Sequence, residues 1–198
     1  MDLFAAEPEL LPIPVDDGEL YFMQQLPLPF ANAEVMQRLL DETVWKAETI
    51  FLFGREVAQP RLSAWYGEAR YTYSGRTFDP LPFTAVQLEI KRAVEAATGR
   101  RFNSVLLNHY RNEQDSMGFH SDDEPELGRE PAIASVSFGD SRTFILKHKK
   151  QAKTVKIDLT DGSLLLMAGK LQHNWRHGIN KERQPRGARI NLTFRLII

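Results

Sequence analysis

Two segments in the first half of the chain place apolar residues at helical spacing. In the first, the apolar residues recur mostly at intervals of three and four: Val35, Met36, Leu39, Leu40 and Val44. Asn32 precedes this run, which predicts an amphipathic helix with an N-cap at Asn32. In the second, Thr84-x-x-Gln87 forms a capping box and predicts a helix that ends near Gly99.

From residue 102 onward the pattern changes to short runs rich in β-branched and aromatic residues, which predict strands. The predicted strands span residues 102–110, 133–138, 143–147, 154–159, 163–167 and 189–197. Between residues 50 and 82, aromatic residues alternate with Gly and Pro, which favours short strands and loops over a helix. Two helices followed by a run of strands predict an α+β fold with a β-sandwich core.

The last predicted strand has two chemically different faces, because side chains alternate along a strand. One face carries residues that predict core packing: Ile190, Leu192, Phe194 and Leu196. The other face carries polar residues: Arg189, Asn191, Thr193 and Arg195. Two guanidinium groups on one strand suit a small dicarboxylate, since each binds a carboxylate through paired hydrogen bonds. The residues alone also fit the solvent-facing side of an edge strand.

The composition is that of one globular domain, with 198 residues, 42% of them apolar and 26% charged. No apolar run is long enough to span a bilayer, and the N-terminus shows no secretory signal. We therefore expect a protein that is not secreted, cytoplasmic in a bacterium or nuclear in a eukaryote. The absence of Cys excludes disulfides, thiolate metal sites and Cys nucleophiles. Any metal must be held by His, Asp or Glu.

The net charge of −1 conceals an uneven distribution. Residues 1–20 contain six acidic residues, no basic one and three prolines, which predicts a loosely held tail. Residues 141–198 contain thirteen Lys and Arg and three acidic residues. Such a surplus is typical of proteins that bind polyanions, although an ordinary solvated surface fits it as well.

The clearest candidate for chemistry is the sequence His120-Ser121-Asp122. An imidazole and a carboxylate two residues apart on an extended segment share one face, and both are metal ligands. A third ligand would come from the other histidines: His109, His148, His173 and His177. Two histidines and one carboxylate with open positions form the facial triad of non-haem Fe(II) oxygenases. The pair alone is also compatible with polar residues on a surface loop.

Four motifs together resemble the AlkB family of Fe(II)/2-oxoglutarate dioxygenases in order and spacing: Asn108-x-Tyr110, His120-x-Asp122, Trp175-Arg176-His177 and Arg189-x-Asn191-Leu-Thr-Phe-Arg195. The resemblance covers roughly residues 50–198 and is closest to the homologues that repair alkylated duplex DNA. It implies an α+β fold with a double-stranded β-helix (jelly roll) core, flanking N-terminal helices and a nucleotide-recognition lid. We expect one compact domain with an acidic tail at residues 1–20, helices and lid at 21–101, and the catalytic core at 102–198.

The resemblance also implies which residues bind iron and 2-oxoglutarate. The residues that match iron ligands, and so carry the catalysis, are His120, Asp122 and His177. Arg195 matches the arginine that grips the distal carboxylate of 2-oxoglutarate. The other residues that match the cosubstrate pocket are Asn108, Tyr110, Arg189, Asn191 and Thr193. Fe(II), 2-oxoglutarate and O₂ are therefore the implied cofactor and cosubstrates.

The implied reaction is oxidative demethylation of 1-methyladenine and 3-methylcytosine in DNA, which releases formaldehyde, succinate and CO₂. A methyl group buried in a duplex is reached only when its base is flipped out. Residues that match nucleic-acid contacts are Tyr71, Tyr73, Asp123, Glu124, Phe53, Arg61, Lys149 and Lys150. The tyrosines match aromatic residues of the lid, and Phe53 matches a finger that fills the gap left by the base.

Two other functions remain open from the sequence. The first is an oxygenase of the same fold that acts on RNA, tRNA or a protein. The second is a non-enzymatic module that binds nucleic acid, which the complete set of three ligands and two arginines disfavours. We expect a monomer whose partner is alkylated DNA or possibly RNA. We expect no interaction with a membrane.

Overall fold

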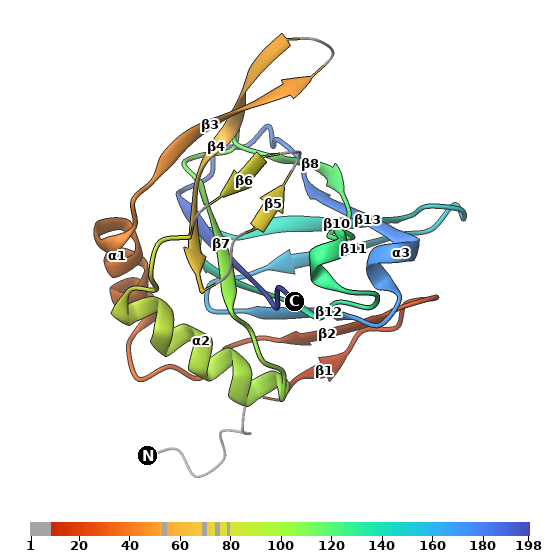
Figure 1. The fold of residues 1–198 in the computed structure, drawn as a ribbon, viewed down its shortest axis with the longest axis horizontal. Helices are drawn as coiled ribbons and strands as arrows, with labels where there is room; N and C mark the ends of the chain where they lie inside the picture. The colour runs from red at the N-terminus through yellow and green to blue at the C-terminus, as the bar shows by residue number, and fades with distance from the viewer. Residues whose placement is uncertain (1–8, 53–54, 69–70, 74–75, 79) are drawn as a thin grey trace.

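The computed structural model describes residues 9–52, 55–68, 71–73, 76–78 and 80–198, and in it two antiparallel sheets pack face to face (Figure 1). The larger sheet contains, in spatial order, β1 (Leu11–Pro12), β2 (Glu19–Met23), β12 (Leu164–Ala168), β9 (Ile133–Gly139), β14 (Arg189–Arg195), β7 (Ser104–Tyr110), β4 (Arg55–Gly67) and β3 (Lys46–Leu52). The smaller sheet contains β11 (Thr154–Leu159), β10 (Arg142–His148), β13 (Trp175–Ile179) and β8 (Met117–His120). Strands β5 (Tyr71–Tyr73) and β6 (Arg76–Phe78) form a separate pair.

The two predicted helices are present and pack against the larger sheet (Figure 1). Helix α2 (Ala85–Thr98) has the predicted capping box at Thr84, and Gly99 ends it with a left-handed φ of 65°. Helix α1 (Asn32–Glu42) differs from the prediction at its start, because Ala31 is the N-cap and makes no side-chain cap. The amide of Asn32 donates instead to Asp161 Oδ2 at 3.2 Å. None of the helices among the described residues has the length and apolar character needed to cross a bilayer.

The strands predicted after residue 102 are present within one or two residues of their expected ends, and β14 stops at Arg195, two residues before its expected end. Strands β8 and β13 were not predicted, because both are short and their few apolar residues are interrupted by Gly and polar residues. Strand β4 runs for 13 residues through a region where short strands and loops were expected. Its Pro60 lies where the register with β3 shifts, and a bulge is a position at which a strand tolerates proline.

Part of the segment expected as a loose acidic tail belongs to the larger sheet. Strand β2 pairs with β12, and Leu20 is buried. The backbone carbonyl of Asp16 accepts a hydrogen bond from Trp175 Nε1 at 2.8 Å, and its carboxylate pairs with Lys153. Strand β4 also pairs with β7 across the expected boundary at residue 101. The expected boundaries at residues 20 and 101 therefore do not divide the sheet, because strand pairing crosses both of them.

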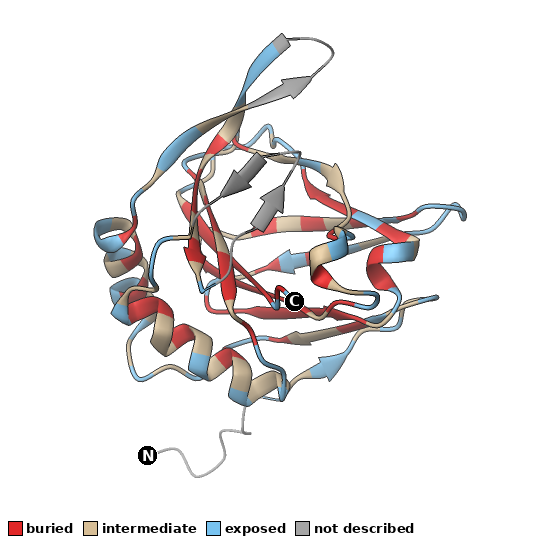
Figure 2. Ribbon diagram, viewed as in Figure 1, coloured by how far each residue is buried: buried red, intermediate tan, exposed pale blue. Residues whose placement is uncertain are grey.

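Strand β14 lies in the middle of the larger sheet, between β9 and β7, so it is not an edge strand. Its apolar face fills the core between this sheet and the helices, and the central strands are almost entirely buried (Figure 2). Ile190, Leu192 and Phe194 have no exposed surface. The prediction of Leu196 as a core residue is wrong, because the strand ends one residue earlier and Leu196 is 43% exposed. The polar face of β14 is turned toward the smaller sheet.

Glu95 joins the end of α2 to the start of β7, and its titration offers a test of this junction. The carboxylate accepts from the backbone N–H of Phe102 at 2.9 Å and pairs with Lys91 at 3.1 Å. Burial acts to raise its pKa, but these contacts outweigh burial and lower the pKa below the ordinary value. A lowered pKa stabilises the folded state above the unfolded-state pKa and loses that effect as the pH falls.

We expect Glu95→Gln to lower the free energy of unfolding at pH 7 by about 1.5 kcal/mol, the scale of one hydrogen bond to a charged group. As the pH falls through the lowered folded-state pKa, the carboxylate becomes protonated in both states and the difference from the wild-type chain should shrink and disappear. Urea unfolding over a series of pH values decreasing from 7 measures both quantities. A difference that persisted unchanged at low pH would mean that the ionised carboxylate has no part in the junction.

Candidate active site

A pocket between the two sheets collects the polar face of β14 and the histidine-carboxylate motif. Its polar lining consists of Asn108, Tyr110, His120, Asp122, Ser135, His177, Arg189, Asn191, Thr193 and Arg195. The apolar lining includes Leu106, Met117, Phe144, Leu159, Met167 and Ile179. The structure thus brings together, in one cavity, every residue that the sequence assigned to iron and to 2-oxoglutarate.

Three of these residues form a group that could hold a metal ion. His120 ends β8 and lies opposite His177 in the pairing of β8 with β13, and Asp122 follows two residues later. The ligand atoms of the three lie within 4.8 Å of one another. Asp122 Oδ2 is 3.7 Å from His177 Nε2 and is buried without a hydrogen-bond partner among the described residues. An orphaned carboxylate oxygen beside two imidazoles fits a divalent metal.

The other three histidines lie outside this group. His148 accepts hydrogen bonds at Nδ1 from the backbone N–H groups of residues 150 and 151, and its Nε2 lies 3.3 Å from Asp17. His173 contacts the backbone carbonyl of Arg129. His109 packs on the opposite side of β7 against Trp45, with 5.2 Å between ring centroids. Of the four histidines that the sequence left open as a third ligand, the structure brings His177 to the pair.

The surroundings of the group favour the protonation states that metal ligation requires. Burial lowers the pKa of His177 to about 3, and the neighbouring His120 acts in the same direction. Burial acts to raise the pKa of Asp122, but Arg195 and the histidines outweigh it and hold that pKa well below its usual range. Near neutral pH, His177 is therefore neutral and Asp122 is ionised.

Gln172 contacts the backbone of Asp122 and so helps to position this ligand. It was not identified from the sequence. It lies in the short helix α3 (Leu171–Asn174), is 1% exposed, and accepts the backbone N–H of Asp122 on Oε1 at 3.0 Å. Its amide also lies 3.6 Å from the sulfur of Met167. No sequence motif marked this residue, because the hydrogen bond joins positions 50 residues apart. Phe144 is a second residue of the site that was not identified from the sequence. Its ring stacks on the His177 ring, with 5.1 Å between the ring centroids.

We expect Gln172→Leu to weaken metal binding about 10-fold to 100-fold, the usual effect of removing a residue that orients a ligand. The substitution keeps the side-chain volume but leaves the buried N–H of Asp122 without an acceptor, so the carboxylate is held less firmly. Isothermal titration with Mn(II) measures the affinity. Gln151→Leu, an exposed change on the neighbouring hairpin, serves as the control. An unchanged Mn(II) affinity in the Gln172 variant would contradict the orienting role.

The polar face of β14 is fixed by hydrogen bonds to β9. Arg189 Nη2 donates to Ser137 Oγ at 2.9 Å, and Asn191 Nδ2 donates to Ser135 Oγ at 2.7 Å. Thr193 Oγ1 donates to Asn191 Oδ1 at 3.0 Å. The two serines alternate along β9, so the strand pattern itself could have identified them.

The two arginines of β14 lie in different surroundings. Arg195 Nη2 donates to Asp122 Oδ1 at 2.8 Å, which places Arg195 at the metal end of the pocket. Arg189 lies six residues away along the strand, and its Nε and Nη1 are buried without a hydrogen-bond partner among the described residues. Burial lowers the pKa of Arg189 to about 10. The geometry therefore favours Arg189, rather than Arg195, as the partner of the carboxylate farther from the metal.

Tyr110 lies against two guanidinium groups at the Arg189 end of the pocket. The Cζ atoms of Arg189 and Arg142 are 5.0 Å and 5.7 Å from its ring centroid. Cations on aromatic faces are stabilised by the ring quadrupole, so the tyrosine helps to hold two like charges close together. Of the two, Arg142 is paired with Glu182 at 3.2 Å, whereas Arg189 lines the cavity and suits a carboxylate.

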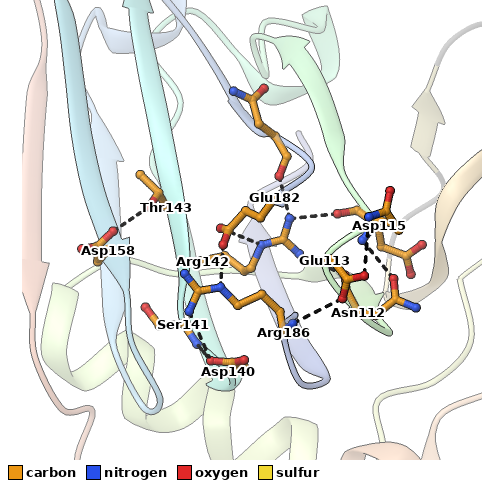
Figure 3. Close-up of polar contacts among 12 residues, drawn as sticks. Asn112, Glu113, Asp115, Asp140, Ser141, Arg142, Thr143, Asp158, Glu182 and Arg186 are labelled. Atoms are coloured by element: carbon orange, nitrogen blue, oxygen red, sulfur yellow. Dashed lines mark hydrogen bonds and ion pairs between the residues drawn. The ribbon is translucent and has the colours of Figure 1, made fainter. Parts of the chain in front are cut away.

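Arg142 connects the loops that close this end of the pocket (Figure 3). The residue begins β10 and is 1% exposed. Its guanidinium donates to the carbonyls of Asn112, Asp115 and Asn180 and to the carboxylate of Glu182, at 2.6–3.2 Å. These acceptors lie in the loops between β7 and β8 and between β13 and β14. Because the same loops connect pocket-lining residues, Arg142 fixes their ends relative to one another.

The residues assigned to nucleic acid are less concentrated. Asp123 follows the metal motif directly and pairs with Lys149 at 3.4 Å, while Lys149 also donates to the carbonyl of Gln172 at 2.8 Å. Lys150 is exposed on the hairpin between β10 and β11, and Glu124 precedes the 3₁₀ turn η1 (Pro125–Leu127). Asp123 and Lys149 therefore lie together beside the metal motif.

Other assignments to nucleic acid are not supported or not described. Arg61 is only 6% exposed and its guanidinium is turned into the protein, so the predicted role as a DNA contact is not supported by its burial. The backbone of Tyr71 and Tyr73 forms β5, but their side chains lie outside the described part of the chain. Phe53 lies outside the described residues altogether.

Two stacked antiparallel sheets around a His-Asp-His group and two arginines define the class of Fe(II)/2-oxoglutarate oxygenases. The chain belongs to this class: a model of the "2OG-Fe(II) oxygenase superfamily" matches residues 19–195. Membership implies Fe(II), 2-oxoglutarate and O₂, and the donor set of the pocket fits these groups. The predicted α+β fold with a jelly-roll core is confirmed by this match. The solved structure of OsALKBH1 is similar in fold, with a TM-score of 0.67 over 93% of this chain and 99% of that chain at 18% identity.

Sequence relatives place the chain among the AlkB homologues, as the motifs predicted. Human alpha-ketoglutarate-dependent dioxygenase alkB homolog 3 is 44% identical over 173 residues, covering 82% of this chain and 60% of the relative. Human DNA oxidative demethylase ALKBH2 is 39% identical over 157 residues, covering 74% and 60%. ALKBH2 of Arabidopsis thaliana is 36% identical, covering 91% and 67%. The chain thus spans about 60% of the length of the human relatives.

Proposed function

We propose that this chain removes N-methyl groups oxidatively from alkylated bases in DNA, with 1-methyladenine and 3-methylcytosine as substrates. The observation that carries the proposal is that the His-Asp-His group and Arg189 line the same pocket. The name of the ALKBH2 relatives, DNA oxidative demethylase, supports the nucleic-acid substrate. The basic hairpin beside the metal group, with Lys149 and Lys150, supports a polyanionic partner. The substrate would place the protein in a bacterial cytoplasm or a nucleus.

The residues of the pocket would hold the reacting groups in a fixed order. His120, Asp122 and His177 would ligate the metal, and Arg195 keeps Asp122 ionised and oriented. Bound Fe(II) would supply the oxidising chemistry, in which 2-oxoglutarate and O₂ yield succinate and CO₂ while the N-methyl carbon is hydroxylated and leaves as formaldehyde. Arg189 would bind the far carboxylate of 2-oxoglutarate, so that the keto acid end points toward the metal.

The side chains near the metal also provide an environment for a cationic base. Asp123 is half-exposed and follows the metal ligand Asp122 directly. A carboxylate at this position would stabilise the positive charge that N-methylation places on adenine or cytosine. Phe144 and Met117 line the pocket with apolar surface and would limit the access of water to the reacting methyl group.

Mass spectrometry of an oligonucleotide that carries one 3-methylcytosine tests the proposal. The oligonucleotide is incubated with protein, Fe(II), ascorbate and 2-oxoglutarate as a single strand, as a duplex and as the matching RNA. Loss of one methylene mass together with formation of succinate is the expected result for DNA. Demethylation of RNA alone would replace DNA by RNA as the substrate. Succinate formation without demethylation of any oligonucleotide would overturn the proposed substrate and leave the oxygenase activity.

A further inference from the structure

Arg61 lies in the middle of β4, on the side of the larger sheet that faces the pocket, and is almost completely buried. Its exposed fraction is 6%. Neither the metal group nor the described nucleic-acid side of the molecule uses it. A buried guanidinium is costly unless its donors are satisfied, so its partners indicate what the residue does.

Among the described residues, Arg61 has two acceptors, and both are neutral oxygens in or beside the wall of the pocket. Its Nε donates to the side-chain Oδ1 of Asn108 at 2.7 Å, and its Nη1 donates to the carbonyl of Ser116 at 3.3 Å. The N–H of Ser116 in turn donates to the carbonyl of Pro60 at 2.9 Å. Arg61 thereby ties β4 to β7 and to the residue that precedes Met117 in the pocket lining.

The contact with Asn108 fixes the orientation of its amide. A guanidinium has only donors, so the atom of Asn108 that faces Arg61 must be the oxygen. The amide nitrogen Nδ2 is then left to donate in another direction. Asn108 is 1% exposed, lines the pocket and lies directly opposite Asn191 of β14 in the strand pairing.

We infer that Arg61 is a positioning residue of the 2-oxoglutarate pocket, which holds the Asn108 amide so that Nδ2 donates to the cosubstrate. Without Arg61, the amide can rotate by half a turn and present its oxygen, which repels a carboxylate or carbonyl oxygen. The inference rests on the proposed use of 2-oxoglutarate but not on the identity of the methylated substrate. It replaces the role in DNA binding that the sequence suggested for this residue.

Arg61→Met tests the inference, because methionine keeps the length of the side chain and removes every donor. The affinity for 2-oxoglutarate is measured by calorimetry on the Mn(II)-loaded protein without nucleic acid. The affinity for a fluorescent oligonucleotide is measured by anisotropy without 2-oxoglutarate. We expect 2-oxoglutarate to bind about 10-fold to 100-fold more weakly, the effect of losing one hydrogen bond in which a charged donor takes part, with oligonucleotide affinity unchanged. Arg92→Met, an exposed change on α2, is the matched control and should alter neither affinity.

The opposite result, weaker oligonucleotide binding with unchanged 2-oxoglutarate affinity, would overturn the inference. A double-mutant cycle with Asn108→Ala provides a second test, since a residue that acts through Asn108 should add little once Asn108 is removed. Fully additive losses would also overturn it. If Arg61→Met does not fold, Arg61→Lys keeps a donor on a flexible stem and allows the same measurements, with a smaller loss of 2-oxoglutarate affinity expected. Because neither binding assay needs a methylated base, failure of the proposed demethylation would remain distinguishable from failure of this inference.

Discussion

Replacing His177 with alanine is expected to reduce turnover at least about 1000-fold, equivalent to about 4 kcal/mol in the activation barrier. The imidazole is buried opposite His120 and contacts Asp122, so its loss removes one of three ligands. The fold should survive, because burial lowers the pKa of His177 to about 3 and keeps the imidazole neutral. Replacing a neutral side chain does not remove a charged partner from Asp122. Turnover is measured as succinate formation at saturating 2-oxoglutarate.

A thermal shift assay with Mn(II) separates loss of the ligand from loss of the fold. A metal present at 100 times its dissociation constant stabilises the native state by about 2.7 kcal/mol. The wild-type chain should therefore melt at a higher temperature with Mn(II), whereas the His177→Ala chain should show no shift. His173→Ala changes another histidine close in sequence, on the exposed surface of α3, and should keep both turnover and the shift. A Mn(II) shift of wild-type size in the His177 variant would remove this residue from the metal site.

Local sequence patterns correctly predicted which site residues share a face when those residues lie on one extended segment. The alternation of residues 189–195 separated the core face of β14 from its polar face, and the two-residue spacing placed His120 and Asp122 on one side of the chain. The central place of β14 in its sheet could not be predicted in this way. Strand order depends on which segments pair across the fold, and no local pattern specifies that pairing.

Roles that depend on distant partners are the ones for which the structure suggests an alternative to the sequence-based prediction. Arg195 and Asp122 are 73 residues apart, and Arg61 and Asn108 are 47 residues apart. A long basic side chain fits a surface contact as readily as a buried one until its partner is known. The acidic segment around Asp16 suggested a loosely held tail for the same reason, since its partners are distant in sequence. Asp16 in fact pairs with Lys153 and accepts a hydrogen bond from Trp175. Burial and hydrogen-bond partners therefore add information on such residues that residue type alone does not contain.

The contrast between the two arginines of β14 leads to the other large effect. Arg189→Met should raise the KM for 2-oxoglutarate about 100-fold, or about 2.7 kcal/mol, because a buried guanidinium that lines the pocket away from the metal group is the natural partner of a carboxylate. Turnover at saturating 2-oxoglutarate and Mn(II) affinity should change little. The variant should fold, because removing a buried cation whose Nε and Nη1 have no partner among the described residues relieves an unfavourable burial.

Arg195→Met should behave differently, because this guanidinium donates to Asp122 at 2.8 Å. Its removal leaves a fully buried carboxylate without its cation, which costs about 3–5 kcal/mol of folding stability in comparable cases. The pKa of Asp122 should rise, so Mn(II) binding should weaken and become more sensitive to acid. Calorimetric titration of each variant with Mn(II), and then with 2-oxoglutarate, distinguishes the two. A selective loss of 2-oxoglutarate affinity in the Arg195 variant, with the Arg189 variant unaffected, would restore the assignment made from the sequence motif, because only a direct contact with the cosubstrate explains that pattern.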